Sequence, residues 1–228
     1  MAAGCGSRCP AMRKNPFYAL DDLDEIRRLI DENPWATLVS NTSAGLVASH
    51  YPILVDRDRE ELSIVTHLGR PDDRIHELPD HELLMVVQGP HGYISSSWYG
   101  DHVEVPTWNF LAAHLSGVPE ILSPEENSAV LHRLVEHFER RVPRPRLLDG
   151  TPADAENAQT DMRGTVGLRL TPTRIVGKRK MSQNQSPEIV DAVIDQLEGN
   201  GPYASPPLAR EMRLANHRDR TADQTPRS

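Results

Sequence analysis

Four runs of β-branched and apolar residues follow one another between residues 35 and 88, each bounded by turn-forming residues. This pattern is typical of short strands and not of long amphipathic helices. Only a short Thr-Ser-Ala segment separates the first two runs, which predicts a hairpin. Strand character returns further along the chain. The expected strand segments are WATLVSN (35–41), GLVASHYPILVD (45–56), ELSIVTH (61–67), ELLMVVQ (82–88), GYISSSWY (92–99), VPTWNFLAAHLSGVPEIL (105–122) and MRGTVGLRLTPTRIVGKRK (162–180).

Three longer helices are expected between these strands, because apolar residues recur there at helical spacing behind capping residues or Pro. A short helix over 72–78, a loop over 143–161 and a helical piece over 208–214 complete the pattern. The sequence shows neither a βαβ alternation nor a Gly-rich dinucleotide or phosphate loop. It therefore predicts a mainly β fold with peripheral helices (α+β), a β-barrel decorated by helices. The three longer helices are expected over 21–33, 124–141 and 186–197.

Composition narrows the function classes. The 228 residues carry a net charge of −8, which weighs against a protein whose main task is to grip duplex DNA. No apolar run is long enough to cross a bilayer, and the first residues lack the apolar centre of a signal peptide. Cys5 and Cys9 lie in a Gly/Ala/Ser-rich leader without further metal ligands. We therefore expect a cytoplasmic protein with a disordered leader over 1–11 and a disordered tail over 216–228.

The segment from Gly89 to Asn109 concentrates aromatic rings, although aromatic residues make up only 5% of the chain. Tyr93, Trp98, Tyr99 and Trp108 stand among small hydroxyl side chains. Rings supply stacking surface, and hydroxyl and amide groups supply directional hydrogen bonds, so the segment favours a pocket for a flat, polar-edged ligand. The alternative is a hairpin whose rings fill a core. The neighbouring polar residues are Ser95, Ser96, Ser97, Thr107 and Asn109.

Charged and imidazole groups near strand ends are the other candidates. His67 and Arg70 could present an imidazole and a phosphate-binding guanidinium, or could be a surface pair. Ser49-His50 lies between apolar neighbours, and we expect His50 to be either a buried, hydrogen-bonded histidine or a ligand contact. His76 and His81 resemble a zinc-protease helix only superficially, because Pro79 stops the helix. A basic patch with short polar neighbours indicates an anion site or a solvated turn: Lys178, Arg179, Lys180, Ser182, Gln183 and Asn184.

These blocks together resemble the PaiB-like family of FMN-binding split-barrel proteins, which are labelled negative transcriptional regulators. The likeness covers about residues 12 to 215 and would make Met12, instead of Met1, the true start. It implies a six-stranded split β-barrel of the pyridoxamine-phosphate-oxidase type and a homodimer with flavin at the subunit interface. The segments that carry it are NPWATLVSN, GLVASHYPILVD, THLGR, VVQGPHGYISSSWY, VPTWNF and GKRKMSQN.

By motif position, the resemblance implies that two sets of residues contact FMN. One set lies in the first half of the chain and would face the flavin and its phosphate: Ser49, His50, His67 and Arg70. The other set would line the pocket and approach from the basic patch: Tyr93, Ser95, Ser97, Trp98, Tyr99, Thr107, Trp108, Asn109, Lys178, Lys180, Ser182 and Gln183.

The sequence departs from the family pattern where a cofactor would be held. Arg179 stands where the family usually has Trp, and Pro71-Asp72-Asp73 replaces Ala-Asn-Pro. Ser96 replaces a Pro, and the segment 143–161 lacks an expected Trp. Related piperazate synthases bind haem b on the same barrel, and His67 stands where their axial ligand is expected, so it is a metal ligand only if haem is bound.

Three functions follow from the resemblance. The first is an FMN-binding regulator or sensor, with DNA as a weakly supported partner. The second is an enzyme, either a flavin oxidoreductase or a haem-dependent former of N–N bonds. The third is a protein that keeps the barrel but binds neither cofactor. No catalytic residue can be named, because acidic residues are scattered and no nucleophile motif occurs.

Overall fold

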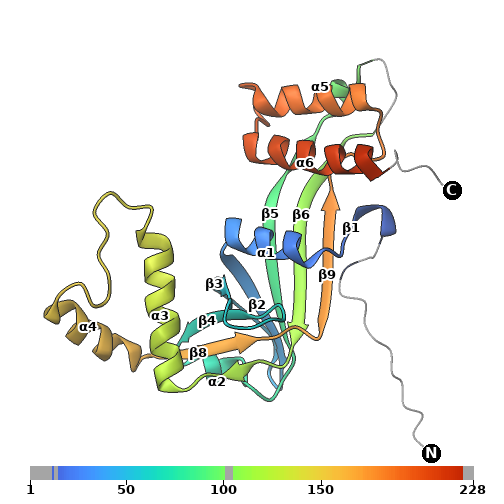
Figure 1. The fold of residues 1–228 in the computed structure, drawn as a ribbon. Helices are drawn as coiled ribbons and strands as arrows, with labels where there is room; N and C mark the ends of the chain where they lie inside the picture. Colours follow the sequence, from blue (N-terminus) through green and yellow to red (C-terminus); the bar gives the residue numbers. More distant parts are fainter. Residues whose placement is uncertain (1–11, 13–14, 101–104, 223–228) are drawn as a thin grey trace, which may run out of the picture. The chain divides into compact units, whose positions relative to one another are not determined.

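The computed structural model describes residues 12, 15–100 and 105–222 of the chain (Figure 1). The chain divides into two compact units, each described here by itself. Unit 1 comprises Met1–Leu20, Pro90–His114 and Val176–Ser228, and unit 2 comprises Asp21–Gly89 and Leu115–Ile175. Strands β5, β6 and β9 contribute residues to both units. No described helix is long and apolar enough to span a membrane.

The sheet of unit 2 is a meander extended by later strands. Its strands are hydrogen-bonded in the order β5-β2-β3-β4-β8-β7, and each of these pairs is antiparallel. The β2–β3 hairpin pairs Trp35 with Pro52 and ends with Thr42 opposite Gly45. The strands are β2 (Trp35–Thr42), β3 (Gly45–Val55), β4 (Ile64–Gly69), β5 (Leu83–Ile94), β7 (Glu120–Ile121) and β8 (Thr165–Leu170).

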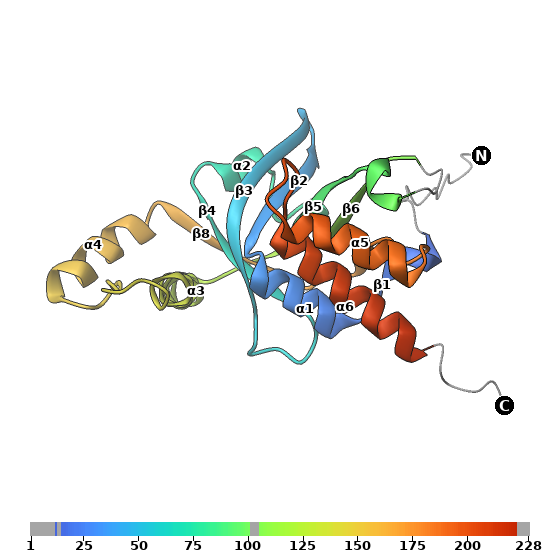
Figure 2. The same cartoon turned by 90° about the horizontal axis from the view of Figure 1, so that it is seen from above.

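Helices cover this sheet because each buries one apolar stripe. Helix α1 (Leu23–Glu32) begins at the Asp22 cap and contacts β3. Helix α3 (Pro124–Glu139) packs on β4 and β8 (Figures 1 and 2). Its first turn is fixed by a capping box in which Ser123 and Glu126 bind each other's backbone N–H groups. The buried stripes are Ile26, Leu29 and Ile30 on α1, and Val130 and Leu134 on α3, the latter two packed with Val65 and Leu122.

Unit 1 joins a helical pair to the ends of three long strands. Its strands follow the order β1-β9-β6-β5, and β1 pairs antiparallel with β9. Helices α5 and α6 lie side by side in both views (Figures 1 and 2). They share a buried apolar seam in which Val193 and Met212 are fully buried. The elements are η1 (Pro16–Tyr18), β1 (Ala19–Leu20), η2 (Ser96–Tyr99), β6 (Thr107–Gly117), β9 (Arg174–Lys180), α5 (Pro187–Glu198) and α6 (Pro206–Ala222).

The mainly β class with peripheral helices is confirmed, but three local expectations were wrong. The described residues form nine strands instead of six, because β1 and β7 are two-residue pairings and 162–180 divides into β8 and β9. The expected loop over 143–161 contains α4 (Pro152–Met162), which begins at a Thr151 cap. The expected strand over 92–99 ends at Ile94, and a 3-10 helix follows.

The short helices also differ from the sequence prediction. Helix α2 (Asp72–Ile75) ends before residue 78, and both Arg70-Pro71 and Leu78-Pro79 are cis. Helix α6 continues to Ala222, although the sequence predicts a disordered tail from residue 216. The expected leader over 1–11, with Cys5 and Cys9, lies outside the described residues.

Candidate functional site

In unit 2, a carboxylate organises the turn between β4 and α2. Asp72 Oδ2 accepts hydrogen bonds from Ser49 Oγ at 2.8 Å and from the Tyr51 hydroxyl at 2.7 Å. The same Tyr51 oxygen accepts the Gly69 backbone N–H at 3.2 Å. The bond from Tyr51 helps to hold the pKa of Asp72 below its usual value, so the carboxylate stays charged. This network fixes the backbone that carries His67 and Arg70.

His76 extends this network into the buried interior. Its Nε2 lies 3.0 Å from Ser49 Oγ, and its Nδ1 lies 2.8 Å from Ser40 Oγ. Because the Ser49 hydroxyl donates to Asp72, Nε2 must donate to Ser49, and Nδ1 then accepts from Ser40. Burial lowers the pKa of His76, which matches this neutral form. His76 is therefore used in holding β2, β3 and α2 together.

His67 and Arg70 differ in how they meet their surroundings. His67 is half-buried, its Nδ1 is buried without a hydrogen-bond partner, and its ring meets Tyr51 edge-on at 6.2 Å between centroids. Burial lowers the pKa of His67, so the imidazole is neutral. Arg70 is exposed, and its Nη1 lies 3.1 Å from Asp73 Oδ2. The departure from the family pattern at residue 73 thus puts an acid directly on the expected phosphate-binding cation.

Ser49 and His50 lie on opposite faces of β3, since side chains alternate along a strand. Ser49 faces the Asp72 network, whereas His50 is exposed and its Nδ1 lies 3.1 Å from Thr37 Oγ1 on the neighbouring strand. The two side chains therefore cannot face one ligand from the same side of the sheet.

In unit 1, two lysines lie on one face of β9, beside the start of β6. Lys180 Nζ donates to Thr107 Oγ1 and to the Trp108 carbonyl at 3.1 Å. Lys178 Nζ stands 5.5 Å from the centre of the Phe110 ring. Burial and the nearby Lys178 charge lower the pKa of Lys180. No carboxylate pairs with either lysine in the described part of the chain, so the pair is suited to an anion.

Trp108, the residue after Thr107 on β6, belongs to an aromatic cluster. Trp108 stacks on His91 at 6.5 Å and meets Tyr93 edge-on at 6.3 Å between ring centroids. Tyr93 in turn contacts Tyr203, at 5.0 Å. The Trp108 side chain is 56% exposed, which leaves ring surface for a ligand. His91 and Tyr203 were not predicted, and only His91 has a local signal, its place in the ring-rich segment.

The remaining predicted contacts of unit 1 are mostly used within the protein. Asn109 is buried and donates to Ser182 Oγ at 2.8 Å, while its own Oδ1 has no hydrogen-bond partner. Gln183 folds back on the backbone of residues 179 and 181. Among the η2 residues and their cap, Ser95 and Ser97 share a hydrogen bond of 2.8 Å, Trp98 is half-buried and Tyr99 is buried.

The structure thus brings together part of the predicted contacts in each unit: Lys178, Lys180 and Thr107 in unit 1, and Ser49, His67 and Arg70 around the Asp72 turn in unit 2. The group in unit 1 combines cations, hydroxyls and an exposed indole, which fit the phosphate and the ring system of a flavin mononucleotide. The group in unit 2 offers a neutral imidazole and an already paired guanidinium. No cluster of three or more His, Cys, Asp or Glu that could hold a metal ion occurs among the described residues.

Comparison with known proteins identifies the class. Residues 12–174 match the family described as "Putative FMN-binding domain", and the chain belongs to this family. The PaiB-like assignment made from the sequence is confirmed by a relative of that type. Over 184 residues the chain is 30% identical to the protease synthase and sporulation protein PAI 2 of Bacillus subtilis (strain 168), with 80% of this chain and 87% of that protein covered.

Solved structures share the fold at low identity. The FAD and heme binding protein from Mycobacterium smegmatis has a TM-score of 0.53 and 16% identity, covering 77% of this chain and 80% of that one. The flavocytochrome Anf3 from Azotobacter vinelandii has a TM-score of 0.54 and 14% identity, covering 74% and 72%. At these identities the likeness shows the fold alone.

Proposed function

We propose that this protein binds FMN as a homodimer, with the flavin at the subunit interface, and acts as a regulator or sensor of the PaiB type. The family match supports the cofactor, and the regulatory role rests on the relationship to PAI 2. The acidic net charge of −8 makes DNA a partner only through local basic patches.

The observation that carries this proposal is the lysine pair on β9. Lys178 and Lys180 share a strand face, and each ammonium raises the free energy of the other. A phosphate dianion relieves that repulsion and gains charge-assisted hydrogen bonds. Thr107 and the Trp108 carbonyl lie beside Lys180, and the Phe110 ring lies beside Lys178, so polar and ring groups both adjoin the two ammonium groups.

The phosphate-specific part of this proposal is tested by titrating the protein with FMN and with riboflavin, which lacks the phosphate. We expect FMN to bind at least tenfold more tightly, since one charge-assisted hydrogen bond contributes about 1.5–3 kcal/mol. Flavin fluorescence and the visible absorption spectrum are the measurements. The Lys180→Gln variant should bind FMN and riboflavin almost equally.

Arg179→Gln is the matched control, because Arg179 lies between the two lysines and faces the other side of the strand. It removes the same charge from the same strand and should keep the preference for FMN. Equal affinities for FMN and riboflavin in the unmodified protein, or equal losses in both variants, would contradict the assignment. Sedimentation of the flavin-loaded protein tests the dimer, and a monomer that binds flavin would rule out the interface site.

A second candidate is haem binding, favoured by His67. This imidazole is half-buried and kept neutral by burial, as an iron ligand must be. The structural neighbour from Mycobacterium smegmatis is described as binding both FAD and haem. Haem added to the protein should then give a Soret band that His67→Ala removes while FMN binding persists. An unchanged Soret band in that variant would exclude His67 as the ligand.

The regulatory role has its own test, a gel shift at physiological salt with the protein in its flavin-loaded and flavin-free forms. A regulator should retard a specific fragment and respond to the flavin, whereas retardation that falls away with salt on every fragment is nonspecific phosphate binding. Absence of any specific complex would leave the flavin-binding proposal intact and remove the regulatory one.

A further inference from the structure

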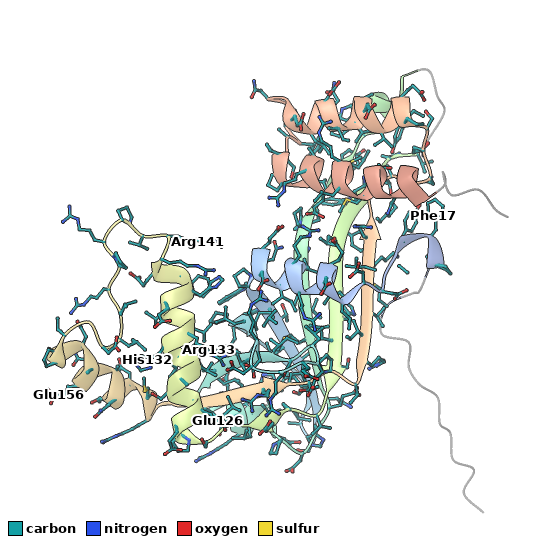
Figure 3. The ribbon with its side chains drawn as sticks, viewed as in Figure 1. Phe17, Glu126, His132, Arg133, Arg141 and Glu156 are labelled. Atoms are coloured by element: carbon teal, nitrogen blue, oxygen red, sulfur yellow. The ribbon has the colours of Figure 1, made fainter. Side chains whose placement is uncertain are left out.

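A cavity of about 720 Å³ lies in unit 2, beside the sheet. This volume falls within the range of small-molecule sites. It is bounded by the first turn of α3, the last turn of α4 and the start of β8, at the place where α4 leads into β8 (Figure 1). Glu126 marks that turn of α3 and Glu156 marks α4 in Figure 3.

Two guanidinium groups, the exposed Glu125 carboxylate and an apolar floor line this cavity. Arg70 comes from the end of β4, and Arg163 caps the C-terminus of α4. Arg163 is exposed and has no ion pair with any residue that the structure describes. The floor combines Leu122 and Val166, which are buried, with the half-buried Met162. A ligand that satisfies both parts has an anionic head and an apolar body.

Asn127 adds a polar group at the back of the cavity. Its side chain is 94% buried, and Nδ2 donates to Thr165 Oγ1 at 2.9 Å. Thr165 in turn donates to the Met162 carbonyl at 2.9 Å, so the amide orientation is fixed and Oδ1 is left without a partner. Gly167 makes room for this oxygen, because a Cβ there would stand 2.8 Å from it. A buried acceptor without a partner, in the lining of a cavity, is a feature of a binding pocket, since a folded core normally pairs such atoms and a donor group of a ligand would satisfy this one.

We propose that this cavity binds an amphipathic organic anion, a carboxylate or sulfonate with an apolar ring or chain. Arg163 binds the anionic group, Arg70 adds positive charge nearby while it stays paired with Asp73, and the apolar body lies against Met162, Leu122 and Val166. The cavity lining has only Arg70 in common with the predicted flavin contacts. The proposal does not depend on flavin binding.

Two fluorescent probes that differ by a single charged group test this site. 8-Anilinonaphthalene-1-sulfonate has an anionic sulfonate, and N-phenyl-1-naphthylamine is the same ring system without it. We expect the sulfonate probe to bind one site per chain, and Arg163→Gln to weaken it about tenfold, the effect of losing one charge-assisted hydrogen bond. The uncharged probe should bind both proteins equally.

Matched variants separate this site from nonspecific binding. Arg144→Gln removes an exposed charge from the segment between α3 and α4, away from the cavity lining, and should change neither probe. Met162→Trp and Gln159→Trp both place an indole in the cavity and should weaken both probes. Gln159 is exposed, so its variant folds even if the Met162 variant does not, and the melting temperature of each variant verifies the fold.

The probe titrations are repeated with saturating FMN. Unchanged binding of the sulfonate probe, with flavin fluorescence showing that FMN is bound, supports a separate site, whereas the arginine and indole variants test the cavity whether or not FMN binds. The proposal is overturned if FMN displaces the sulfonate probe from the unmodified protein, if Arg163→Gln and Arg144→Gln have equal effects, or if the indole variants keep full binding of both probes.

Discussion

Arg169 on β8 forms ion pairs with three carboxylates, and its replacement tests how the sheet of unit 2 is held to α3. Its side chain is 9% exposed, and Nε lies 2.9 Å from Asp56 Oδ2, which belongs to a carboxylate that is 1% exposed. The guanidinium also contacts Glu126 at 3.2 Å and Glu120 at 3.1 Å. Arg133 on α3 supplies the second cation for Asp56, at 3.1 Å.

We expect Arg169→Met to lower the free energy of unfolding by about 3–5 kcal/mol. Removing one partner of a buried ion pair leaves the other charge without compensation, which costs that much. The side chains of Glu120 and Glu126 are partly exposed to water, so the loss of their ion pairs adds little to the change in the free energy of unfolding. For a chain of this size the loss corresponds to a fall of roughly 6–20 °C in melting temperature. Urea titration and calorimetry are the measurements.

The pH dependence of this loss identifies its cause. Burial alone would raise the pKa of Asp56, but the hydrogen bonds and charges of Arg169 and Arg133 overcome it and hold the pKa below the usual 3.8. The folded protein therefore gains stability from Asp56 at every pH above about 3.8, and loses it as the pH falls toward the lowered value. In Arg169→Met the pKa of Asp56 rises, so the difference between the two proteins should shrink in acid.

A double-mutant cycle completes this test. Asp56→Asn with Arg169→Met removes both charges, and should be more stable than the sum of the single losses predicts by about 1–3 kcal/mol. Arg133→Met is the control, because Arg133 is 33% exposed and its ion pairs are partly solvated. A loss below 1 kcal/mol for Arg169→Met at pH 7, or a loss that is the same at pH 7 and at a pH below 3.8, would refute this reasoning.

Two further predictions concern the same unit. Gly167→Ala should lower the free energy of unfolding, measured in urea, by about 1–3 kcal/mol, because its Cβ would meet the Asn127 side chain and Cα within 3.0 Å. Gly69→Ala is the control, since the nearest neighbour of its Cβ is at 3.9 Å. An equal loss in both variants would exclude the contact with α3 as the cause. His76→Gln should make the pH dependence of unfolding less steep below about 6.5. Burial lowers the pKa of His76, so the unfolded chain takes up this proton first, and the variant lacks the part of the acid destabilisation that comes from this imidazole. Parallel pH profiles for the two proteins would mean that His76 does not titrate with unfolding.

The helices show which parts of this fold could be predicted from the sequence. The start of α3 is encoded within four residues, Ser123 to Glu126, which form the whole capping box. Helix α4 has a Thr cap and Pro at its first turn, but only Ala158 is buried, so it lacks the apolar stripe on which sequence prediction depends. Such a helix has capping residues but almost no buried apolar side chains, so it is recognised only from the three-dimensional structure.

The candidate site, too, was predictable from the sequence only in part. The residue types were predictable, because aromatic rings and lysines concentrate in two short segments. Their pairing was not, because Tyr203 reaches Tyr93 from the linker between α5 and α6, and Asp72 reaches Ser49 from helix α2. Contacts between residues that are distant in the chain depend on strand register and helix packing, and a single sequence records neither directly.

The consecutive acids at 72 and 73 decide which cations of this chain can hold a phosphate. Asp72 is fully engaged by Ser49 and Tyr51, and thereby fixes the turn that carries Arg70. Asp73 occupies Arg70 itself, so an anion approaching Arg70 must compete with a carboxylate already in place. The lysines on β9 face no such competitor among the described residues, and their mutual repulsion favours an incoming anion. In the proposed flavin site we therefore expect the main phosphate contact on β9 instead of at the end of β4, and Lys180, not Arg70, is the informative variant for flavin binding.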